Sequence, residues 1–373
     1  MNKHQEHKIP ILSFYSGGGL MDMGFEKAGF EIIWTNEFDE DFIKLHEAGI
    51  TSWRKARGNG VKAEIFNKKS ITEIKAIDII NEAFPNGKPE CFGIIGGPPC
   101  QDFSMNGNLK GFDGDRGKLT EVFLDKILSL MPTFFVMENV TGLVKRKQTL
   151  DYLNELLKNV RSKYCIDYKM LNALDFGVPQ FRERVFFIGI RKDKLNDEIG
   201  CRSKKWFEYL ENRNYQDSAK NYDWPKAIKF GHKKINKPQD IPIELCVYNC
   251  LIGKEDINKI PNANEHFKLY VDKKKLINIK EGETNRPSFK RLHRYKYSPT
   301  ACYGNNEVHL HPWENRRISV REALRIQGVE DNYILPAELS VSKKFKMIGN
   351  GVPVPLAEAV AKMLKKILIE NKL

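Results

Sequence analysis

Cysteine is scarce in this chain, and long apolar runs are missing from it. The 373 residues include seven cysteines at irregular spacing, an odd number that suits a reducing compartment better than a disulfide framework. Cys246 and Cys250 have no second Cys or His pair beside them, so no metal site is expected there. The polar residues 1–8 are followed by no apolar h-region, and nowhere do about 18 uncharged apolar residues run together. We therefore expect a cytoplasmic protein without a membrane partner.

The composition is that of a folded chain with a basic surplus. Hydrophobic residues make up 41% of the sequence, and 61 Lys and Arg against 48 Asp and Glu give a formal net charge of +13. This length is typical of two domains, and the apolar content excludes disorder over the whole chain. Residues 1–190 carry 25 basic and 25 acidic groups, whereas residues 191–330 carry 29 and 19. In the second region aromatics lie among the basic groups, which indicates a nucleic-acid surface, with a merely Lys-rich surface as the alternative.

Apolar runs of strand length alternate with helix-like periodic stretches between residues 10 and 190. This alternation is typical of an α/β fold with a doubly wound sheet. The expected strands are 10–15, 31–36, 91–95, 134–138, 165–171 and 184–190. The expected helices lie near 20–28, 39–48, 72–83, 117–130 and 149–160, at 319–327 with a Ser319/Glu322 capping box, and after Pro353. Residues 192–300 are polar and rich in turn signals, which predicts a separate, irregular domain.

Two strand ends indicate a nucleoside cofactor. The first strand leads into Ser16 and three glycines, where backbone N–H groups and the helix dipole can approach a ligand. The second strand ends at Glu37-Phe38-Asp39, where an acid is placed to accept hydrogen bonds from ribose hydroxyls and Phe38 to stack on adenine. The alternative for the acid is helix capping.

The strongest pattern is Gly-Gly-Pro-Pro-Cys-Gln-Asp-Phe-Ser around Cys100. Its two prolines exclude a helix or central strand, so the segment is a stiff loop at a carboxyl strand end, where ligands bind in this architecture. Glu138 ends a later strand at the same sheet edge, and alternation puts Gln180, Arg182 and Arg184 on one face. A thiol nucleophile, an acid and a guanidinium at one edge predict a catalytic site.

In these motifs the chain resembles the DNA cytosine-C5 methyltransferases. The ordered blocks of that family correspond to residues 15–19, 36–39, 99–104, 115–117, 138–140, 171–184, 316–328 and 349–353. Only about 192–290 is unmatched, the length that the family uses as its target recognition domain. The resemblance implies a Rossmann-like S-adenosylmethionine-dependent methyltransferase sheet in residues 1–190 plus 335–373. It also implies a smaller, irregular α+β or β domain in residues 191–334 that contains the target recognition region.

The resemblance implies S-adenosylmethionine as cofactor, S-adenosylhomocysteine as product, and no metal. The implied cofactor-binding residues are Tyr15, Ser16, Gly17, Gly19, Leu20, Glu37, Phe38, Ser70, Ile71, Pro99, Leu119, Asn350 and Val352. Three of these positions depart from the family. Tyr15 replaces Phe, Leu20 replaces the final glycine of the first block, and Ser70 replaces an Asp that would contact the adenine amino group. Ser70 is still able to accept a hydrogen bond.

The implied mechanism is covalent. The Cys100 thiolate adds to C6 of cytosine, C5 then takes the methyl group of the cofactor, and loss of the C5 proton releases Cys100. Glu138 is expected to hold or protonate N3, and Arg182 to bind the base carbonyl and orient Glu138. Because the target atom is inaccessible in a duplex, the base must flip out. The glycine-rich residues 101–118 are expected to close over it, with simple flexibility as the alternative.

Double-stranded DNA is the implied partner, bound by a monomeric, nucleoid-associated enzyme. Ser104, Gln180 and Arg184 are the expected DNA-binding residues, and side chains of the small domain are expected to read bases in the major groove. A role in restriction-modification, beside an endonuclease of the same specificity, is expected, although a solitary methyltransferase has the same sequence features. His309 and His311 are expected to be structural rather than metal ligands.

Three other functions fit part of the sequence. An RNA methyltransferase of the same fold is disfavoured by the long basic region and by the absence of the Cys-Phe-Thr tripeptide typical of that branch. A non-catalytic DNA-binding relative could lose Cys100, Glu138 or Arg182, yet all three are present. A nicotinamide dehydrogenase would explain the glycine turn but not the Pro-Pro-Cys loop.

Overall fold

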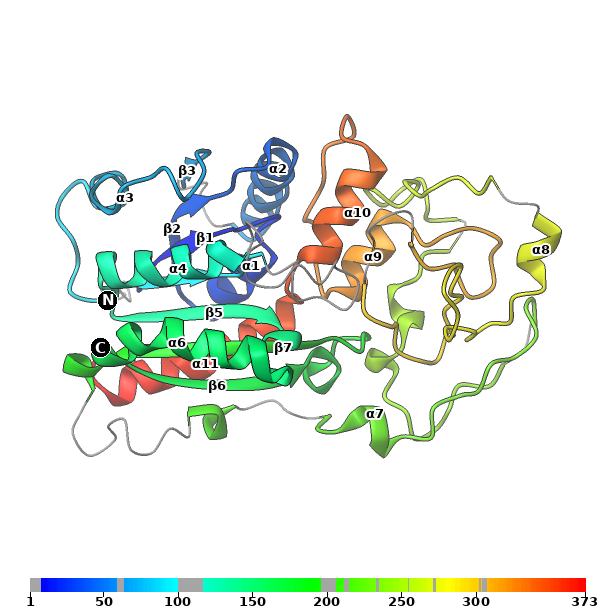
Figure 1. Ribbon diagram of the computed structural model, residues 1–373. Helices are drawn as coiled ribbons and strands as arrows, with labels where there is room; N and C mark the ends of the chain where they lie inside the picture. Colours follow the sequence, from blue (N-terminus) through cyan, green and yellow to red (C-terminus); the bar gives the residue numbers. More distant parts are fainter. Residues whose placement is uncertain are drawn as a thin grey trace, which may run out of the picture.

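The computed structural model places a layered α/β region beside a smaller region with little regular structure (Figure 1). The residues that it describes are 8–58, 64–99, 117–195, 206–210, 215–232, 235–253, 255–270, 273–301, 303 and 307–373. Among the described helices, none has the length and apolar character needed to cross a membrane.

In the described part of the chain, seven strands form one sheet in the order β3-β2-β1-β4-β5-β7-β6. Strands β1 to β5 run parallel to one another, and β7 is antiparallel to both β5 and β6. The strands are β1 (Pro10–Phe14), β2 (Glu31–Asn36), β3 (Ile65–Asn67), β4 (Gly93–Gly96), β5 (Phe134–Val140), β6 (Tyr164–Asn172) and β7 (Glu183–Arg191). The six predicted strands are confirmed within a few residues. The three-residue β3 was missed because it is too short to show a period.

Helices cover both faces of the sheet. They are α1 (Leu20–Lys27), α2 (Glu40–Ala56), α3 (Ala76–Ala83), α4 (Gly117–Leu130), α5 (Gly142–Lys145), α6 (Lys147–Lys163), α7 (Ser218–Asn221), α8 (Lys273–Ile277), α9 (Val320–Ile326), α10 (Val341–Asn350) and α11 (Val354–Glu370). Because side chains alternate along a strand, Ile11 packs with α1 and α11 on one face. Leu12 packs with α3, α4 and α6 on the other.

The helix predictions are confirmed at their positions, but α3 begins at Ala76 rather than at 72, the short α5 was not predicted, and α2 and α10 also differ. The capping box of Ser319 and Glu322 is present at the start of α9. Helix α2 continues past the expected end at residue 48 as far as Ala56. Gly49 lies inside it at a close approach, where a Cβ atom would meet the ring of Tyr333. Helix α10 was not predicted, although Val341, Phe345 and Ile348 recur in it at helical spacing after the N-cap Ser340.

The region between β7 and α9 is irregular, as predicted. It contains short 3-10 turns, the short helices α7 and α8, and isolated bridges such as that between Ile228 and Glu281. One apolar cluster joins it to the sheet domain, with Trp53 from α2, Val247 from the small region and Phe345 from α10. This shared cluster fixes α10 between the two regions.

The cysteines depart from expectation at one position. Cys165 in β6 is disulfide-bonded, whereas Cys91, Cys246 and Cys250 are free. Burial raises the pKa of both Cys246 and Cys250 to about 12, so neither thiol ionises readily.

Candidate active site

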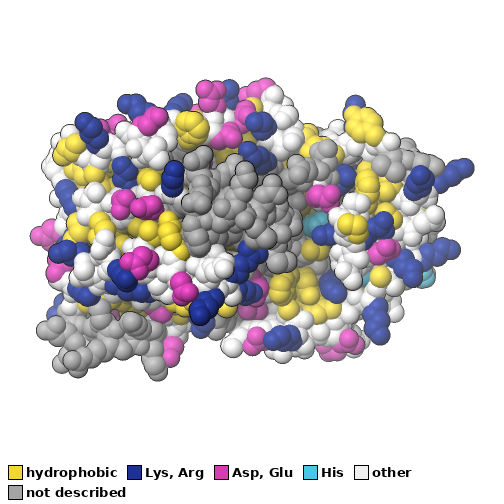
Figure 2. All heavy atoms as spheres, in the orientation of Figure 1, with side chains coloured by type: hydrophobic (Ala, Val, Ile, Leu, Met, Phe, Trp, Pro, Cys, Tyr) yellow, Lys and Arg dark blue, Asp and Glu magenta, His cyan; other side chains and the backbone are white. Residues whose placement is uncertain are grey.

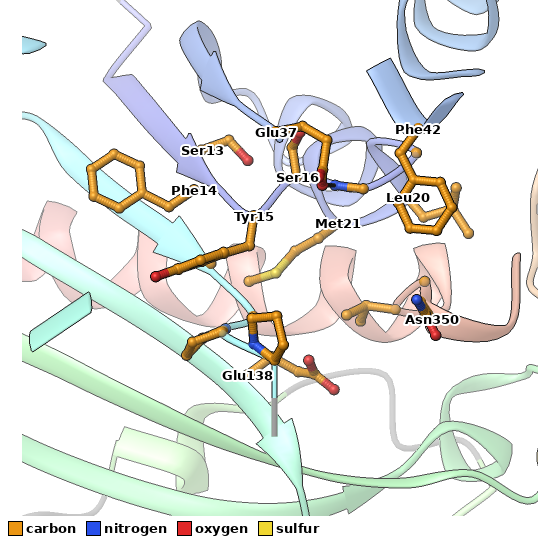
Figure 3. A pocket seen from close by; sticks show the side chains of 18 of the residues that line it. Ser13, Phe14, Tyr15, Ser16, Leu20, Met21, Glu37, Phe42, Glu138 and Asn350 are labelled. Atoms are coloured by element: carbon orange, nitrogen blue, oxygen red, sulfur yellow. Dashed lines mark hydrogen bonds between the residues drawn. The ribbon is translucent and has the colours of Figure 1, made fainter. Parts of the chain in front are cut away.

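A cavity of about 320 Å³ lies at the carboxyl ends of β1, β2, β4 and β5, closed on one side by the end of α10 (Figure 3). Ligands bind at this edge in open α/β sheets because strand ends and helix N-termini converge there. Ten of the residues singled out in the sequence line it: Tyr15, Ser16, Gly17, Leu20, Glu37, Pro99, Glu138, Arg184, Asn350 and Val352.

In the turn after β1, glycines expose their backbone to the cavity. Gly17 and Gly19 have φ angles of 55° and 74°, and Tyr15 has a φ of 53°, a left-handed conformation that is strained for a side chain of this size. At Gly18 a Cβ atom would lie 2.1 Å from Sδ of Met347, so only glycine lets the turn pack against α10. Leu20, which replaces the family's glycine, lies against Gly351.

Glu37 is held at the end of β2 by backbone donors. Its carboxylate accepts hydrogen bonds from the N–H groups of Gly17 (2.9 Å), Phe38 (2.8 Å) and Asp39 (2.9 Å). Asp39 caps α2, accepting from the N–H groups of Asp41 and Phe42. The capping role therefore belongs to Asp39, which leaves Glu37 turned to the cavity (Figure 3).

Five of the residues predicted to bind the cofactor do not line the cavity. Gly19 is the N-cap of α1, and Leu119 accepts a hydrogen bond of 3.1 Å from the Tyr15 hydroxyl through its carbonyl. Ile71 is buried in the core, and the Ser70 hydroxyl bonds to that of Thr72 at 2.7 Å. Phe38 directly follows Glu37 and is 70% exposed, an unusual exposure for an aromatic side chain.

Glu138 lies buried at the end of β5 and pairs with an arginine. Nε of Arg184 is 2.9 Å from Oε1 of Glu138. Burial raises the pKa of Glu138, and the positive charges of Arg184 and Arg182 partly oppose this rise. From the sequence, Arg182 was expected to bind the base carbonyl and to help orient Glu138. In the structure the direct contact belongs to Arg184, because β7 pairs antiparallel with β5 and sets Arg184 opposite Val140.

Arg182 and Gln180 are buried in contacts within the protein. Nη2 of Arg182 donates to the carbonyl of Gly349 at 2.9 Å. Oε1 of Gln180 accepts from the N–H of Ala301 (3.0 Å), and its Nε2 donates to Oε1 of Gln327 (3.2 Å). A DNA contact by the fully buried Gln180 would require these bonds to break, so in this structure Gln180 joins the two regions instead.

The proposed nucleophile Cys100 and the proposed phosphate ligand Ser104 lie outside the described residues. The loop leading to Cys100 is described as far as Pro99, which lines the cavity. Nδ2 of Asn139 donates to the carbonyl of Pro98 at 3.3 Å, and a Cβ atom on Gly97 would lie 2.9 Å from Oε2 of Glu138. The chain therefore enters the Cys100 segment directly beside the Glu138 carboxylate.

His309 and His311 are buried within the small region. Burial lowers the pKa of each to about 3, so both rings are neutral and His311 forms no ion pair with Glu322, although 3.6 Å separates them. Nδ1 of His311 accepts from the N–H of Glu314 at 3.1 Å. Nδ1 of His309 lies 3.3 Å from the hydroxyl of Ser298, so both rings make contacts within the small region.

Several residues that line the cavity were not predicted from the sequence. Phe42 and Met347 line it from α2 and α10, and Asp22 from the first turn of α1. Met347 could not be found because α10 itself was not predicted. Asp22 had a signal, since it is a carboxylate three residues past Gly19 in an otherwise apolar stretch, at a helix N-terminus where an acid is favoured.

Comparison with known proteins agrees with this geometry over nearly the whole chain. The family model for C-5 cytosine-specific DNA methylase matches residues 9–366. The chain belongs to this family. The enzyme is thus a DNA (cytosine-5)-methyltransferase.

Relatives of the enzyme include named Type II methyltransferases. It is 37% identical to the Type II methyltransferase M.NmeDI of Neisseria meningitidis serogroup C, covering 98% of this chain and 86% of that protein. It is 31% identical to the Type II methyltransferase M.MthTI of Methanothermobacter thermautotrophicus, covering 96% and 98%.

Solved structures share the fold of the enzyme. One is a candidate DNA modification methyltransferase encoded in a prophage of E. coli, with a TM-score of 0.69, 25% identity, and coverage of 97% of this chain and 100% of that one. Another is the S. pombe Dnmt2 methyltransferase, with a TM-score of 0.60, 14% identity, and coverage of 98% and 100%. The second likeness concerns the fold alone.

Proposed function

We propose that the cavity at the strand ends holds S-adenosylmethionine. Its volume suits a ligand of nucleoside size, and it offers the Glu37 carboxylate, open glycine backbone and apolar side chains such as Phe42. The exposed Phe38 supports stacking on adenine, and Asn350 and Val352 close the far side. When bound, this cofactor supplies an electrophilic methyl group on a sulfonium. Gly19, Ser70, Ile71 and Leu119 then support the site by holding its walls rather than by lining it.

The observation that carries the catalytic proposal is the buried Glu138–Arg184 pair at the cavity edge. A carboxyl group with a raised pKa is able to hold or protonate N3 of cytosine, which offsets the charge pushed onto the ring when a thiolate adds to C6. Arg184 positions Glu138, and Arg182 is proposed to bind the base carbonyl. The thiolate is that of Cys100, which follows the cavity-lining Pro99.

The division of the chain into a catalytic domain of residues 1–190 plus 335–373 and a recognition domain of 191–334 is part of the same proposal. Lys and Arg side chains are frequent on the part of the visible face that belongs to the small region (Figure 2). Such a surface suits phosphate tracking along duplex DNA. Ser104 and Arg184 are proposed to act near the phosphates of the flipped nucleotide, and the enzyme is proposed to act as a monomer.

A restriction-modification role is proposed from the relatives, which are Type II methyltransferases. In that role the enzyme protects host DNA from an endonuclease of the same specificity. Bisulfite sequencing of DNA from a host expressing the gene would give the methylated site. Methylation scattered without a short consensus sequence would argue against this role.

The test of the mechanism is Cys100→Ala, with Cys91→Ala as the matched control. Cys91 is a free, half-buried thiol at the opposite end of the same strand segment. The Cys100 variant is expected to lose methyl transfer and to keep DNA binding, while the Cys91 variant keeps both. Appreciable turnover by Cys100→Ala would contradict covalent catalysis.

A further inference from the structure

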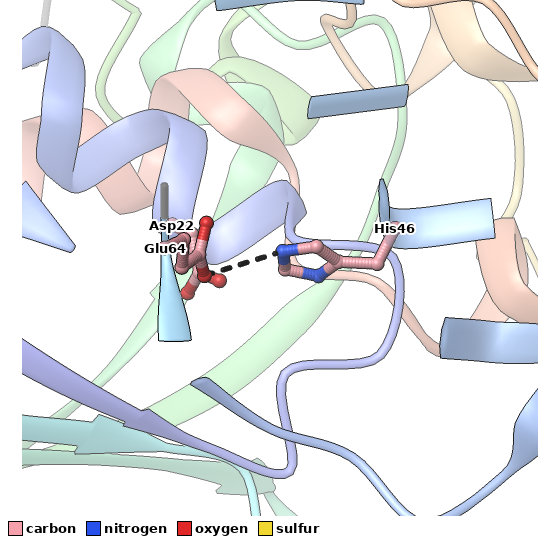
Figure 4. Close-up of side chains that lie close together, drawn as sticks. All are labelled: Asp22, His46 and Glu64. Carbon is pink, nitrogen blue, oxygen red and sulfur yellow. Dashed lines mark ion pairs between the residues drawn. The ribbon is translucent and has the colours of Figure 1, made fainter. Parts of the chain in front are cut away.

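A cluster of buried ionisable side chains lies directly behind the glycine turn (Figure 4). It joins Asp22 of α1, His46 of α2 and Glu64, the residue before β3. One possible ligand atom from each of the three side chains lies within 4.8 Å of the other two. Asp22 and His46 are each only 1% exposed, and Nε2 of His46 is 3.6 Å from Oε1 of Glu64. The hydroxyl of Ser13 donates to Oδ1 of Asp22 at 2.7 Å.

The cluster touches the cofactor cavity at two points. Asp22 and Ser13 both belong to the cavity lining. A Cβ atom on Gly19 would lie 2.8 Å from Cε1 of His46, so the imidazole packs on the turn itself. Oδ2 of Asp22 and both ring nitrogens of His46 have no hydrogen-bond partner among the described residues, so the cluster retains binding capacity for an ion.

The charges around the cluster do not balance. Nη1 of Arg54 is 2.7 Å from Oε2 of Glu64, and Arg54 also pairs with Glu26. From α10 and the small region, the neighbours that reach this turn are Met347, which is apolar, and Tyr333, whose hydroxyl donates to the carbonyl of Gly18. The carboxylates of Asp22, Glu26 and Glu64 are thus grouped in a buried space with the guanidinium of Arg54 and the imidazole of His46. Such a group of charges needs at least one further positive charge.

A proton fits this need better than a metal ion. Arg54 already supplies a positive charge to Oε2 of Glu64, and Ser13 donates to Oδ1 of Asp22, so only one oxygen of each carboxylate is left for a metal ion. Burial raises the pKa of Asp22 to about 7, with the positive charge of His46 opposing this rise. Burial disfavours the charged form of His46, but Glu64 and Asp22 outweigh it and raise the pKa of His46. The cluster is thus poised to exchange a proton near neutral pH.

The negative charge of Asp22 should interact differently with S-adenosylmethionine and with S-adenosylhomocysteine. The methyl donor carries a positive sulfonium that its thioether product lacks. The described cavity lining contains the carboxyl groups of Asp22, Glu37, Asp39 and Glu138 against the single cation Arg184. A negative wall attracts the donor more than the product, and its effect is large where water is excluded.

We propose that Asp22 is a positioning residue, set by His46 and Glu64, whose negative charge makes the enzyme prefer the sulfonium donor and release the thioether product. The inference rests on the proposed cofactor site. Because Asp22 gains a proton as the pH falls through about 7, the preference is stronger at pH 8 than at pH 6.

The test is calorimetric binding of S-adenosylmethionine and S-adenosylhomocysteine to the full-length enzyme at pH 6, 7 and 8. In the wild type, the ratio of the product Kd to the donor Kd is expected to rise with pH. In Asp22→Asn the ratio at pH 8 is expected to fall by about five- to tenfold, the effect of one buried charge. The α-amino group of each ligand titrates near pH 8, so the Asn variant supplies the baseline for that titration.

Two further variants separate a charge effect from a folding effect. His46→Gln removes a positive charge that lowers the pKa of Asp22. The pH at which the Kd ratio changes should therefore be higher in this variant than in the wild type. Glu47→Gln removes an exposed carboxylate on the same helix and should leave the ratio unchanged. Thermal unfolding shows which variants remain folded, and the wild-type pH series tests the proposal even if Asp22→Asn does not fold.

The outcomes distinguish the two proposals. A ratio that is constant with pH in the wild type, or unchanged in folded Asp22→Asn, would overturn the role of Asp22. Failure of both ligands to bind the wild type would instead overturn the cofactor site on which the inference rests.

Discussion

Nε of Arg184 lies 2.9 Å from Oε1 of Glu138, and the pair is largely withdrawn from solvent at the edge of the cavity. The guanidinium opposes the rise that burial produces in the pKa of Glu138. A carboxyl group held in this way has a fixed position and a tuned proton affinity, the two properties that an acid acting on a ring nitrogen needs.

Replacing Arg184 should therefore damage catalysis more than binding. Arg184→Ala removes the direct partner of Glu138, so the pKa of Glu138 should rise further and its carboxyl group should lose its fixed position. We expect kcat for methyl transfer to fall by about 10²-fold, with a smaller change in the Kd for S-adenosylmethionine. The measurement is single-turnover transfer of labelled methyl groups to duplex DNA.

The matched control for Arg184 is Lys145→Gln. Lys145 pairs with Glu183 at 2.8 Å. Glu183 directly precedes Arg184 in the sequence, but the side chains of this pair are exposed. Such exposed pairs contribute little, so this variant should keep wild-type kcat. Equal losses in both variants would show that general disturbance of β7, rather than the pair with Glu138, limits the reaction.

Gly24 is expected to control the packing of the two helices on one face of the sheet. A Cβ atom at Gly24 of α1 would lie 2.5 Å from Cβ of Ala357 and 2.7 Å from the backbone nitrogen of Glu358 in α11. Gly24→Ala should therefore lower the free energy of unfolding by about 1–3 kcal/mol. Gly253→Ala is the control, since among the described residues other than its chain neighbours no atom lies within 4 Å of its added Cβ. Equilibrium denaturation checks both, and equal stabilities would contradict this packing.

Gln180 is predicted to act through stability rather than through DNA contact. Gln180→Leu removes its bonds to Ala301 and Gln327 and leaves a buried N–H group and a buried amide oxygen without these partners. The expected cost is about 1–3 kcal/mol for each group left unsatisfied, measured by thermal unfolding. DNA affinity of the folded variant, and its dependence on salt, should match the wild type. A large selective loss of DNA affinity in a stable variant would restore the DNA-binding role.

The basic surplus of the small region predicts the salt dependence of DNA binding. Lys226, Lys229 and Lys237 are exposed there, and changing all three to Gln should flatten the slope of log K against log salt concentration. Each lysine that contacts a phosphate should reduce the slope by about one. The control is Lys158→Gln on α6, an exposed lysine of the electrically neutral catalytic region. An unchanged slope in the triple variant would place the DNA elsewhere.

The sequence by itself determined the sheet strands other than β3, the capped helix α9 and the segments that converge on the cavity. These features depend on local patterns: apolar period, proline and glycine positions, and acids at strand ends. The shared face expected for Gln180, Arg182 and Arg184 stays a prediction, because β7 begins only at Glu183 and the strand period does not extend over residues 180–182.

Only the tertiary structure decided which residues on that face touch. The antiparallel register of β5 with β7 places Arg184, rather than Arg182, in direct contact with Glu138. The contact with the small region buries Gln180. The cluster of Asp22, His46 and Glu64 likewise joins residues from α1, α2 and the start of β3. No local pattern carries this information, because register and the packing of distant segments set both the partners of a charge and its burial.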